Sequence, residues 1–295
     1  MSQERKPLDG VAICVMLLLT SSWGFQQVTI KWIAADVTPV MQAAIRSVIA
    51  TVLVFAWARL RGVRLFERDG MHWLCVAAGL LFASEFLFIY AGLPYTNASR
   101  MLVFVYLTPP LTALGLHFLV PGEQLRLVQW LGVLIAFAGL VLAFADGFSS
   151  QANTSIGDLC GVIAAVFWAS TTILIRATRL ARATATKLVF YQLAVSSIYM
   201  PIASLLLAEK GVVTITPLAI AVLIFQGAVV GFATYLLWTW LLTRYLATPL
   251  SVLSFMTPMF GVLFGVLLLS EPLSATFAAA AVLVAVGIVL VNLRR

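Results

Sequence analysis

Ten apolar stretches, each close to the length that crosses a lipid bilayer, occupy most of this 295-residue chain. A helix needs about 20 mostly apolar residues to span the hydrocarbon core. We therefore predict an all-α membrane protein with ten transmembrane helices, at 10–31, 39–58, 73–93, 97–120, 127–145, 157–176, 187–208, 216–243, 246–270 and 273–293.

The composition excludes a water-soluble domain. Hydrophobic residues make up 62% of the chain and charged residues only 10%, whereas soluble domains are about a quarter charged. The net charge of +7 comes from basic residues dispersed between apolar runs. No basic patch with interleaved aromatic residues is present, so we expect no nucleic-acid partner. The three cysteines are scattered without a CxxC pair, so we expect neither a disulfide framework nor a metal site, and no cofactor.

The basic residues indicate an orientation in the membrane. With the N-terminus placed inside, 14 of the 18 Lys and Arg residues fall on the inner side and three on the outer side, while Arg46 lies within a span. Cytoplasmic loops collect Lys and Arg. This asymmetry predicts a multi-pass protein of the inner (plasma) membrane with both termini in the cytoplasm.

Two prolines inside apolar spans reveal an internal repeat. The stretch ASRMLVFVYLTPPLTALG resembles ATPLSVLSFMTPMFGVLFG, and an offset of 149 residues places Pro109 on Pro258. At an offset of 148, Glu123 corresponds to Glu271 and AGLVL corresponds to VGIVL. A proline frees the carbonyl group four residues earlier and bends its helix. We predict equivalent kinks at Pro109 and Pro258 that act as flexing points of opposite gates.

The repeat extends over both halves of the chain. An offset of 145 places Trp23 on Trp168 and Lys31 on Arg176, so the predicted repeats are 1–149 and 150–295. Because each holds five spans, an odd number, the two must cross the membrane in opposite directions. Inverted repeats are typical of secondary transporters, which bind substrate near the midplane and work by alternating access. The alternative is an old duplication without a transport role, as in some channels and scaffold proteins.

These features together resemble a known family. SSWGF in the first span, Thr-Pro in a fourth span that ends in PGE, and SEP after the ninth span are similar to the drug/metabolite transporter superfamily of EamA type. Within it the chain most resembles the YddG branch. That resemblance implies export of amino acids, aromatic and other neutral ones, and of amphipathic drugs such as methyl viologen.

Polar residues on one face of a span are candidates for a substrate cavity, because such a face should avoid lipid. In the first span these are Trp23, Gln26 and Gln27, and in the sixth Trp168, Thr171 and Thr172. Their alternative role is hydrogen bonding between helices. Further cavity candidates deeper in the spans are Tyr106, Tyr235, Trp238, Ser251 and Ser254. A single Tyr or Trp can equally be an anchor at the membrane interface.

One carboxylate lies in the middle of a predicted span. Glu85 in the third span is at a depth similar to that of Arg46 in the second, and a charge at that depth is costly unless it is paired. We predict a buried ion pair between them. Two alternatives stay open, namely that Glu85 contacts substrate or couples protons, and that one of the helices is misplaced.

The sequence favours transport over the other classes of function. It contains no HExxH, GxSxG or GxxxxGK[ST] motif and no second buried acid, so we do not expect an enzyme or a nucleotide-driven pump. The expected partners are a small-molecule substrate and the lipid bilayer, with monomer and homodimer both open. Few fixed charges and many aromatic and polar side chains suit a neutral or zwitterionic solute. The alternative is export of a nucleoside, sugar or quaternary amine, or an intramembrane enzyme.

Overall fold

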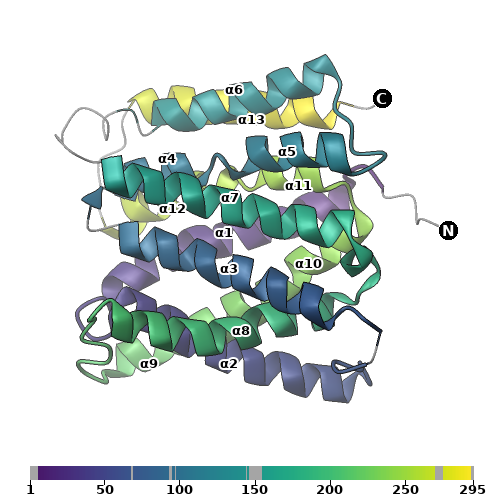
Figure 1. Cartoon of the computed structure of the whole chain (residues 1–295). Coiled ribbons are helices and arrows are strands. Elements are labelled where there is room, and N and C mark those ends of the chain that lie inside the picture. The colour runs from purple at the N-terminus through teal and green to yellow at the C-terminus, as the bar shows by residue number, and fades with distance from the viewer. Residues whose placement is uncertain are drawn as a thin grey trace.

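The computed structural model describes residues 6–293 except 68, 93–94, 97, 144, 146–154 and 270–274. Nearly all of the described chain is helical, with helices running side by side (Figure 1). The elements are α1 (Gly10–Trp32), α2 (Pro39–Leu60), α3 (His72–Gly92), α4 (Ala98–Val105), α5 (Thr108–Leu119), α6 (Leu127–Ala143), α7 (Ser155–Ala177), the short η3 (Arg179–Arg182), α8 (Ala185–Leu206), α9 (Pro217–Ile224), the π-helix η4 (Phe225–Thr234), α10 (Tyr235–Arg244), α11 (Ala247–Leu253), α12 (Met256–Leu269) and α13 (Ala275–Asn292).

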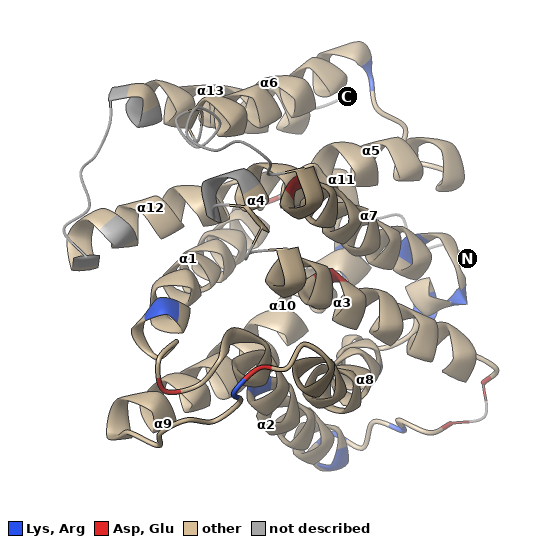
Figure 2. Cartoon of the chain, turned by 60° about the vertical axis from the view of Figure 1, so that its left-hand side comes forward, with Lys and Arg blue, Asp and Glu red and all other residues tan. Residues whose placement is uncertain are grey.

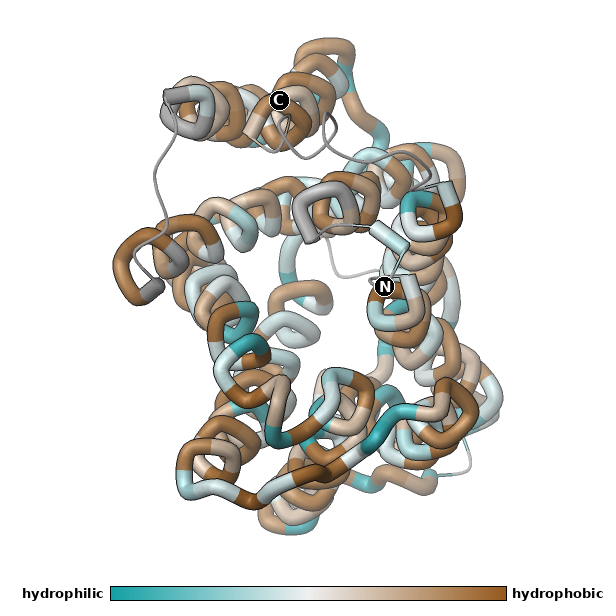
Figure 3. Tube along the Cα trace, turned by 90° about the vertical axis from the view of Figure 1, so that its left-hand side faces the viewer, coloured by the Kyte–Doolittle hydropathy of each residue, from teal (hydrophilic) through white to brown (hydrophobic). Residues whose placement is uncertain are grey.

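The all-α membrane fold is confirmed. Eight helical segments in the described residues are long and apolar enough to cross a membrane, and α6 and residues 279–292 of α13 form two shorter apolar helices. The prediction of ten spans therefore stands as a prediction for these last two. Charged residues lie mainly at helix ends and in loops (Figure 2), while hydrophobic residues predominate along the helices (Figure 3).

Both described chain ends lie at the same end of the bundle, which we call the termini end (Figure 1). The backbone N–H of Lys6 donates to the carbonyl of Arg244 at 3.1 Å, which fixes the start of the chain against the end of α10. The Asp9 side chain then caps α1 by accepting from the Ala12 N–H at 2.9 Å. An even number of membrane crossings places both ends of a chain on one side, so this arrangement fits the predicted topology.

The two prolines interrupt their spans at corresponding positions. The span before Pro109 ends as α4 at Val105 and resumes as α5, while the span before Pro258 ends as α11 and resumes as α12. The Thr108 hydroxyl donates to the Val105 carbonyl at 2.7 Å and so satisfies the acceptor that Pro109 leaves free. In the second half the backbone N–H of Thr257 donates to the corresponding carbonyl at 2.9 Å. Each proline thus ends a helix rather than only bending it.

Helices α6 and α13 pack together along one edge of the bundle (Figure 1) and show the two-fold relation of the halves. A methyl group added at Gly132 would lie 2.8 Å from the carbonyl oxygen of Gly287, and one at Gly139 would lie 2.9 Å from that of Ala280. At the offset of 148 residues, Gly132 corresponds to Ala280 and Gly139 to Gly287. Exchange of the halves therefore turns one contact into the other. A side chain at Gly132 or Gly139 would hold the two backbones apart, so this close packing of α6 on α13 requires glycine at both positions.

Other helix pairs follow the same exchange. Helix α1 packs on α12, and its counterpart α7 packs on α4 and α5, while α2 packs on its own counterpart α8. The π-helix η4 was not predicted from sequence. It packs on α2, where a methyl group at Gly231 would lie 2.8 Å from the Cβ of Ala50. A π-helix widens one turn and is often found at functional sites.

Candidate functional site

Aromatic side chains from three elements meet near the middle of the bundle. Trp23 on α1 lies edge-to-face with Tyr235 and with Trp238 on α10, at centroid distances of 6.5 and 5.8 Å. Its indole N–H donates to the Thr234 hydroxyl at 2.9 Å, which fixes the ring against the end of η4. Phe82 on α3 completes the group, 5.5 Å from Tyr235. Three residues predicted separately from the sequence are thus brought together.

Arg46 and Glu85 lie beside this aromatic group. Both are buried, with exposed fractions of 3% and 6%. Counted from Pro39 in α2 and back from Gly92 in α3, each is the eighth residue of its helix, about 10 Å from the same end of the bundle. The equal depth expected from the sequence is therefore retained by the helices.

The predicted direct ion pair is not formed. Among the described residues, no nitrogen–oxygen contact of ion-pair length joins Arg46 to Glu85. The Arg46 guanidinium instead lies over the ring of Phe86, the residue after Glu85, 4.4 Å from the centroid. The Phe86 ring contacts the face of the guanidinium, while the N–H donors lie in the guanidinium plane and point away from the ring.

A second aromatic contact involves the other half of the repeat. Tyr106, 4% exposed at the end of α4, lies 5.7 Å from Trp168 on α7 and 6.0 Å from Phe255. Tyr106 and Trp168, two cavity candidates predicted separately from the sequence, are therefore brought together.

The remaining candidates differ in how they use their polar atoms. Thr171 donates to the Phe167 carbonyl at 2.9 Å, and Ser254 donates to the carbonyl of Ser251 at 2.6 Å, so both hydroxyl protons are used within their own helices. Thr172 and Ser251 are buried. Gln26 is also buried, and its amide nitrogen has no hydrogen-bond partner in the structure. Gln27 differs, because its side chain is exposed.

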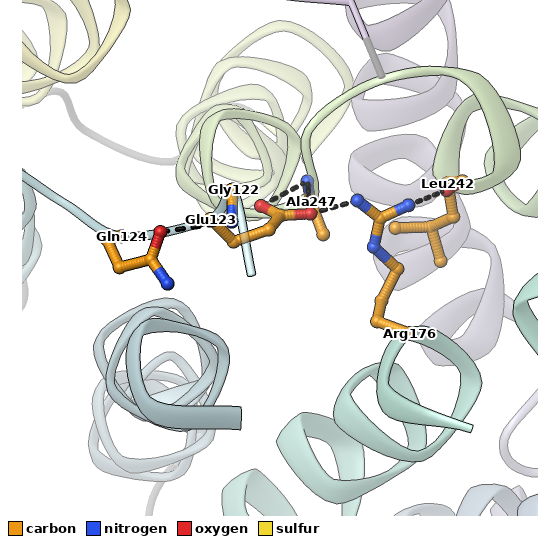
Figure 4. A network of polar contacts seen from close by, with 6 residues as sticks. All are labelled: Gly122, Glu123, Gln124, Arg176, Leu242 and Ala247. Atoms are coloured by element: carbon orange, nitrogen blue, oxygen red, sulfur yellow. Dashed lines mark hydrogen bonds and ion pairs between the residues drawn. The ribbon is translucent and has the colours of Figure 1, made fainter. Parts of the chain in front are cut away.

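The sequence analysis did not single out a buried network of polar contacts, shown in Figure 4. It lies at the termini end, next to Arg244, whose carbonyl accepts from the Lys6 N–H. The side chains of Arg176 on α7 and Glu123 after α5 form an ion pair with exposed fractions of 0% and 3%. A second Arg176 nitrogen donates to the Leu242 carbonyl at 2.5 Å. The Glu123 carboxylate also accepts from the Ala247 N–H, at 3.1 and 3.2 Å, and so caps the start of α11. We call these four residues the latch.

The repeat carried a signal for the latch. The bases Lys31 and Arg176 correspond in the two halves, and so do the acids Glu123 and Glu271. One base and one acid kept at corresponding positions is the pattern expected of a repeated ion pair. The sequence did not reveal the latch because Glu123 lies between the predicted spans 97–120 and 127–145, where an exposed loop residue is expected. The structure instead buries Glu123. Glu271 itself lies outside the described residues.

Apolar helices in two similar halves, with opposite charges and aromatic rings buried between them, define a polytopic membrane transport protein. The EamA-like transporter family model matches residues 10–145 and 155–293. The chain belongs to the EamA-like transporter family. The two matched segments lie on either side of the predicted boundary at 149–150.

Individual relatives are distant in sequence but similar over most of their length. An uncharacterized transporter of Archaeoglobus fulgidus is 27% identical over 87% of both chains. A protein of Escherichia coli named a probable amino-acid metabolite efflux pump is 26% identical over 95% of this chain and 93% of its own. A solved crystal structure superposes with a TM-score of 0.79 at 24% identity, covering 96% of this chain and 98% of the other, which shows the same fold.

Proposed function

We propose that this protein exports amino acids, aromatic and other neutral ones, and amphipathic drugs of the methyl viologen type, across the inner membrane. One observation carries the proposal: among the described residues, the buried Arg46 and Glu85 form no ion pair. The Arg46 guanidinium contacts Phe86, whose ring leads through Phe82 to Tyr235. A site with both charge signs and an aromatic wall complements a zwitterion with an apolar side chain, or a flat cation. The similarity to a probable amino-acid metabolite efflux pump supports the same class of substrate.

The proposed mechanism is alternating access between the inverted halves. The latch joins α7 to the start of α11 and the end of α10, so that end of the bundle cannot open while it is intact. With the predicted topology this is the cytoplasmic end. The helix ends before Pro109 and Pro258 lie at corresponding places in the two halves and supply the flexing points. We also propose that the two repeats are residues 1–149 and 150–295, and that the protein belongs to the YddG branch of its family.

Transport by purified protein in liposomes tests the substrate class. Vesicles loaded with unlabelled phenylalanine, threonine or methionine should accumulate the labelled amino acid by counterflow, above empty vesicles. Glu85→Gln should reduce the rate, because it removes the buried negative charge. Glu67→Gln makes the same change at an exposed acid, whose side chain is 55% exposed, and should transport normally.

The same assay separates the alternatives. No protein-dependent flux of any of the three amino acids, together with flux of a nucleoside, sugar or quaternary amine, would replace the amino-acid proposal by export of that metabolite. Repeating the assay with a pH gradient tests coupling: a Glu85→Gln protein that responds to the gradient as the original does would remove Glu85 from proton transfer. A catalytic product formed in membranes would favour the enzyme alternative.

A further inference from the structure

Arg46 is a buried cation that forms no salt bridge with an acid among the described residues. Among the described residues, the Arg46 guanidinium takes part in no hydrogen bond, and its Nε atom has no partner in the structure. The Phe86 ring, 4.4 Å from the guanidinium, offers only a cation–aromatic contact, which accepts no hydrogen bond in the plane of the group. A guanidinium has five donors, and a donor buried without a partner within a membrane, as Nε is here, is costly. A charged residue that is kept within a membrane despite this cost usually has a function.

The acids and amides around Arg46 have other roles. Glu209 follows α8 in the sequence and lies against the start of α2. Its carboxylate accepts from the hydroxyls of Thr38 and Ser204 at 2.9 and 2.8 Å. Gln42, one turn before Arg46, accepts from Gln226 of η4 at 3.0 Å. No hydrogen bond of the described residues involves the Glu85 carboxylate either. Two opposite charges at equal depth on α2 and α3 are therefore left without direct partners.

We propose that Arg46 binds the carboxylate of the transported amino acid and that Glu85 binds its ammonium group. A guanidinium accepts a carboxylate through two parallel hydrogen bonds, which is the strongest pairing open to it. The carboxylate and the ammonium group of an amino acid are bonded to the same carbon atom, so a single molecule can contact both side chains. The rings of Phe86 and Tyr235 then face the substrate side chain. The inference rests on the proposed function and makes Arg46 the residue that distinguishes amino acids from amines.

The repeat provides the variant that tests this role. At an offset of 146 residues, one more than at Trp23, Arg46 corresponds to Gln192 in the second half, which is buried at 6% exposure, so glutamine fits the corresponding position there. Arg46→Gln should weaken binding of phenylalanine roughly 10- to 100-fold, the effect of losing a charged hydrogen bond. Binding of phenethylamine, which lacks the carboxylate, should change less than threefold. Arg46→Lys should restore part of the phenylalanine affinity.

A matched control comes from the opposite end of the same helix. Arg61 lies over the Trp57 ring at 4.4 Å, the same distance as Arg46 over Phe86, but Arg61 is exposed. Arg61→Gln removes an equal cation–aromatic contact and should leave both affinities unchanged. Affinities are measured by competition against labelled phenylalanine or labelled phenethylamine in detergent-solubilised, monodisperse protein.

The outcomes are distinct. Equal weakening of phenylalanine and phenethylamine by Arg46→Gln would show a structural role only and overturn the proposal. If the variant does not fold, the original protein decides the matter: phenylalanine methyl ester must compete at least tenfold less well than phenylalanine, and equal competition would refute carboxylate binding. A protein that binds neither phenylalanine nor any other amino acid overturns the proposed function itself rather than the role of Arg46.

Discussion

The latch provides the prediction that tests the mechanism most directly. Glu123→Gln keeps the size and one acceptor oxygen of the side chain but removes its negative charge. Arg176, whose side chain is fully buried, then lacks its counter-charge, and the Ala247 N–H has only a neutral acceptor. Removing one partner of a buried ion pair costs about 3–5 kcal/mol. Because the Leu242 carbonyl still accepts from Arg176, we take the lower figure.

That cost applies only to the conformation in which the latch is closed. About 3 kcal/mol converts to a shift on the order of 100-fold toward the conformation that is open at the termini end. Ser251→Cys on α11, 4% exposed, reports the opening through its rate of reaction with a membrane-impermeant maleimide. The reporter is placed in a chain whose Cys14, Cys75 and Cys160 are replaced by alanine. Glu123→Gln should raise the labelling rate from the termini side by up to this factor.

Two further variants make the prediction refutable. Glu67→Gln breaks only an exposed pair with Arg64, with a nitrogen–oxygen distance of 4.0 Å, and should leave labelling unchanged because surface pairs are worth about 0–1 kcal/mol. Combining Glu123→Gln with Arg176→Gln removes both charges and should reverse part of the effect, with a coupling of about 2 kcal/mol. A Glu123→Gln protein that folds but labels at the original rate would refute the latch.

Three other predictions follow from described contacts. Replacing Pro109 or Pro258 by alanine should slow transport severalfold, measured in liposomes, because a continuous helix resists flexing; unchanged rates would reduce the prolines to a role in shape. The hydrogen bond from the Lys187 ammonium holds the pKa of the Asp69 carboxyl below its usual range. That contact stabilises the fold at neutral pH and is lost as the pH falls through the lowered pKa, so thermal stability below about pH 4 should drop more steeply in the original protein than in Lys187→Gln. Gly132→Ala places a methyl group 2.8 Å from a carbonyl oxygen of α13 and should cost about 1–3 kcal/mol, seen as a lower unfolding temperature.

Much of the architecture could be predicted because bilayer physics imposes it on the sequence. Apolar runs of spanning length fix where helices form, and the Pro109–Pro258 correspondence revealed the repeat. The aromatic candidates Trp23, Tyr235 and Trp238 could be named because they lie within apolar spans, but the sequence left open whether they line a cavity or only pack, and their contact came from the structure. These signals are local or periodic, and a sequence displays them directly.

The sequence by itself determined the helices, their repeat and the depth of the two buried charges. Only the tertiary structure decided which side chains meet. At equal depth, Arg46 turns toward Phe86 rather than Glu85, and Glu123 enters the bundle from a loop to meet Arg176. Rotation of a helix about its axis and the path of a loop depend on packing against distant segments, such as the contact of α6 with α13. Hydropathy specifies how deep a residue lies in the membrane, whereas packing specifies the direction in which its side chain points.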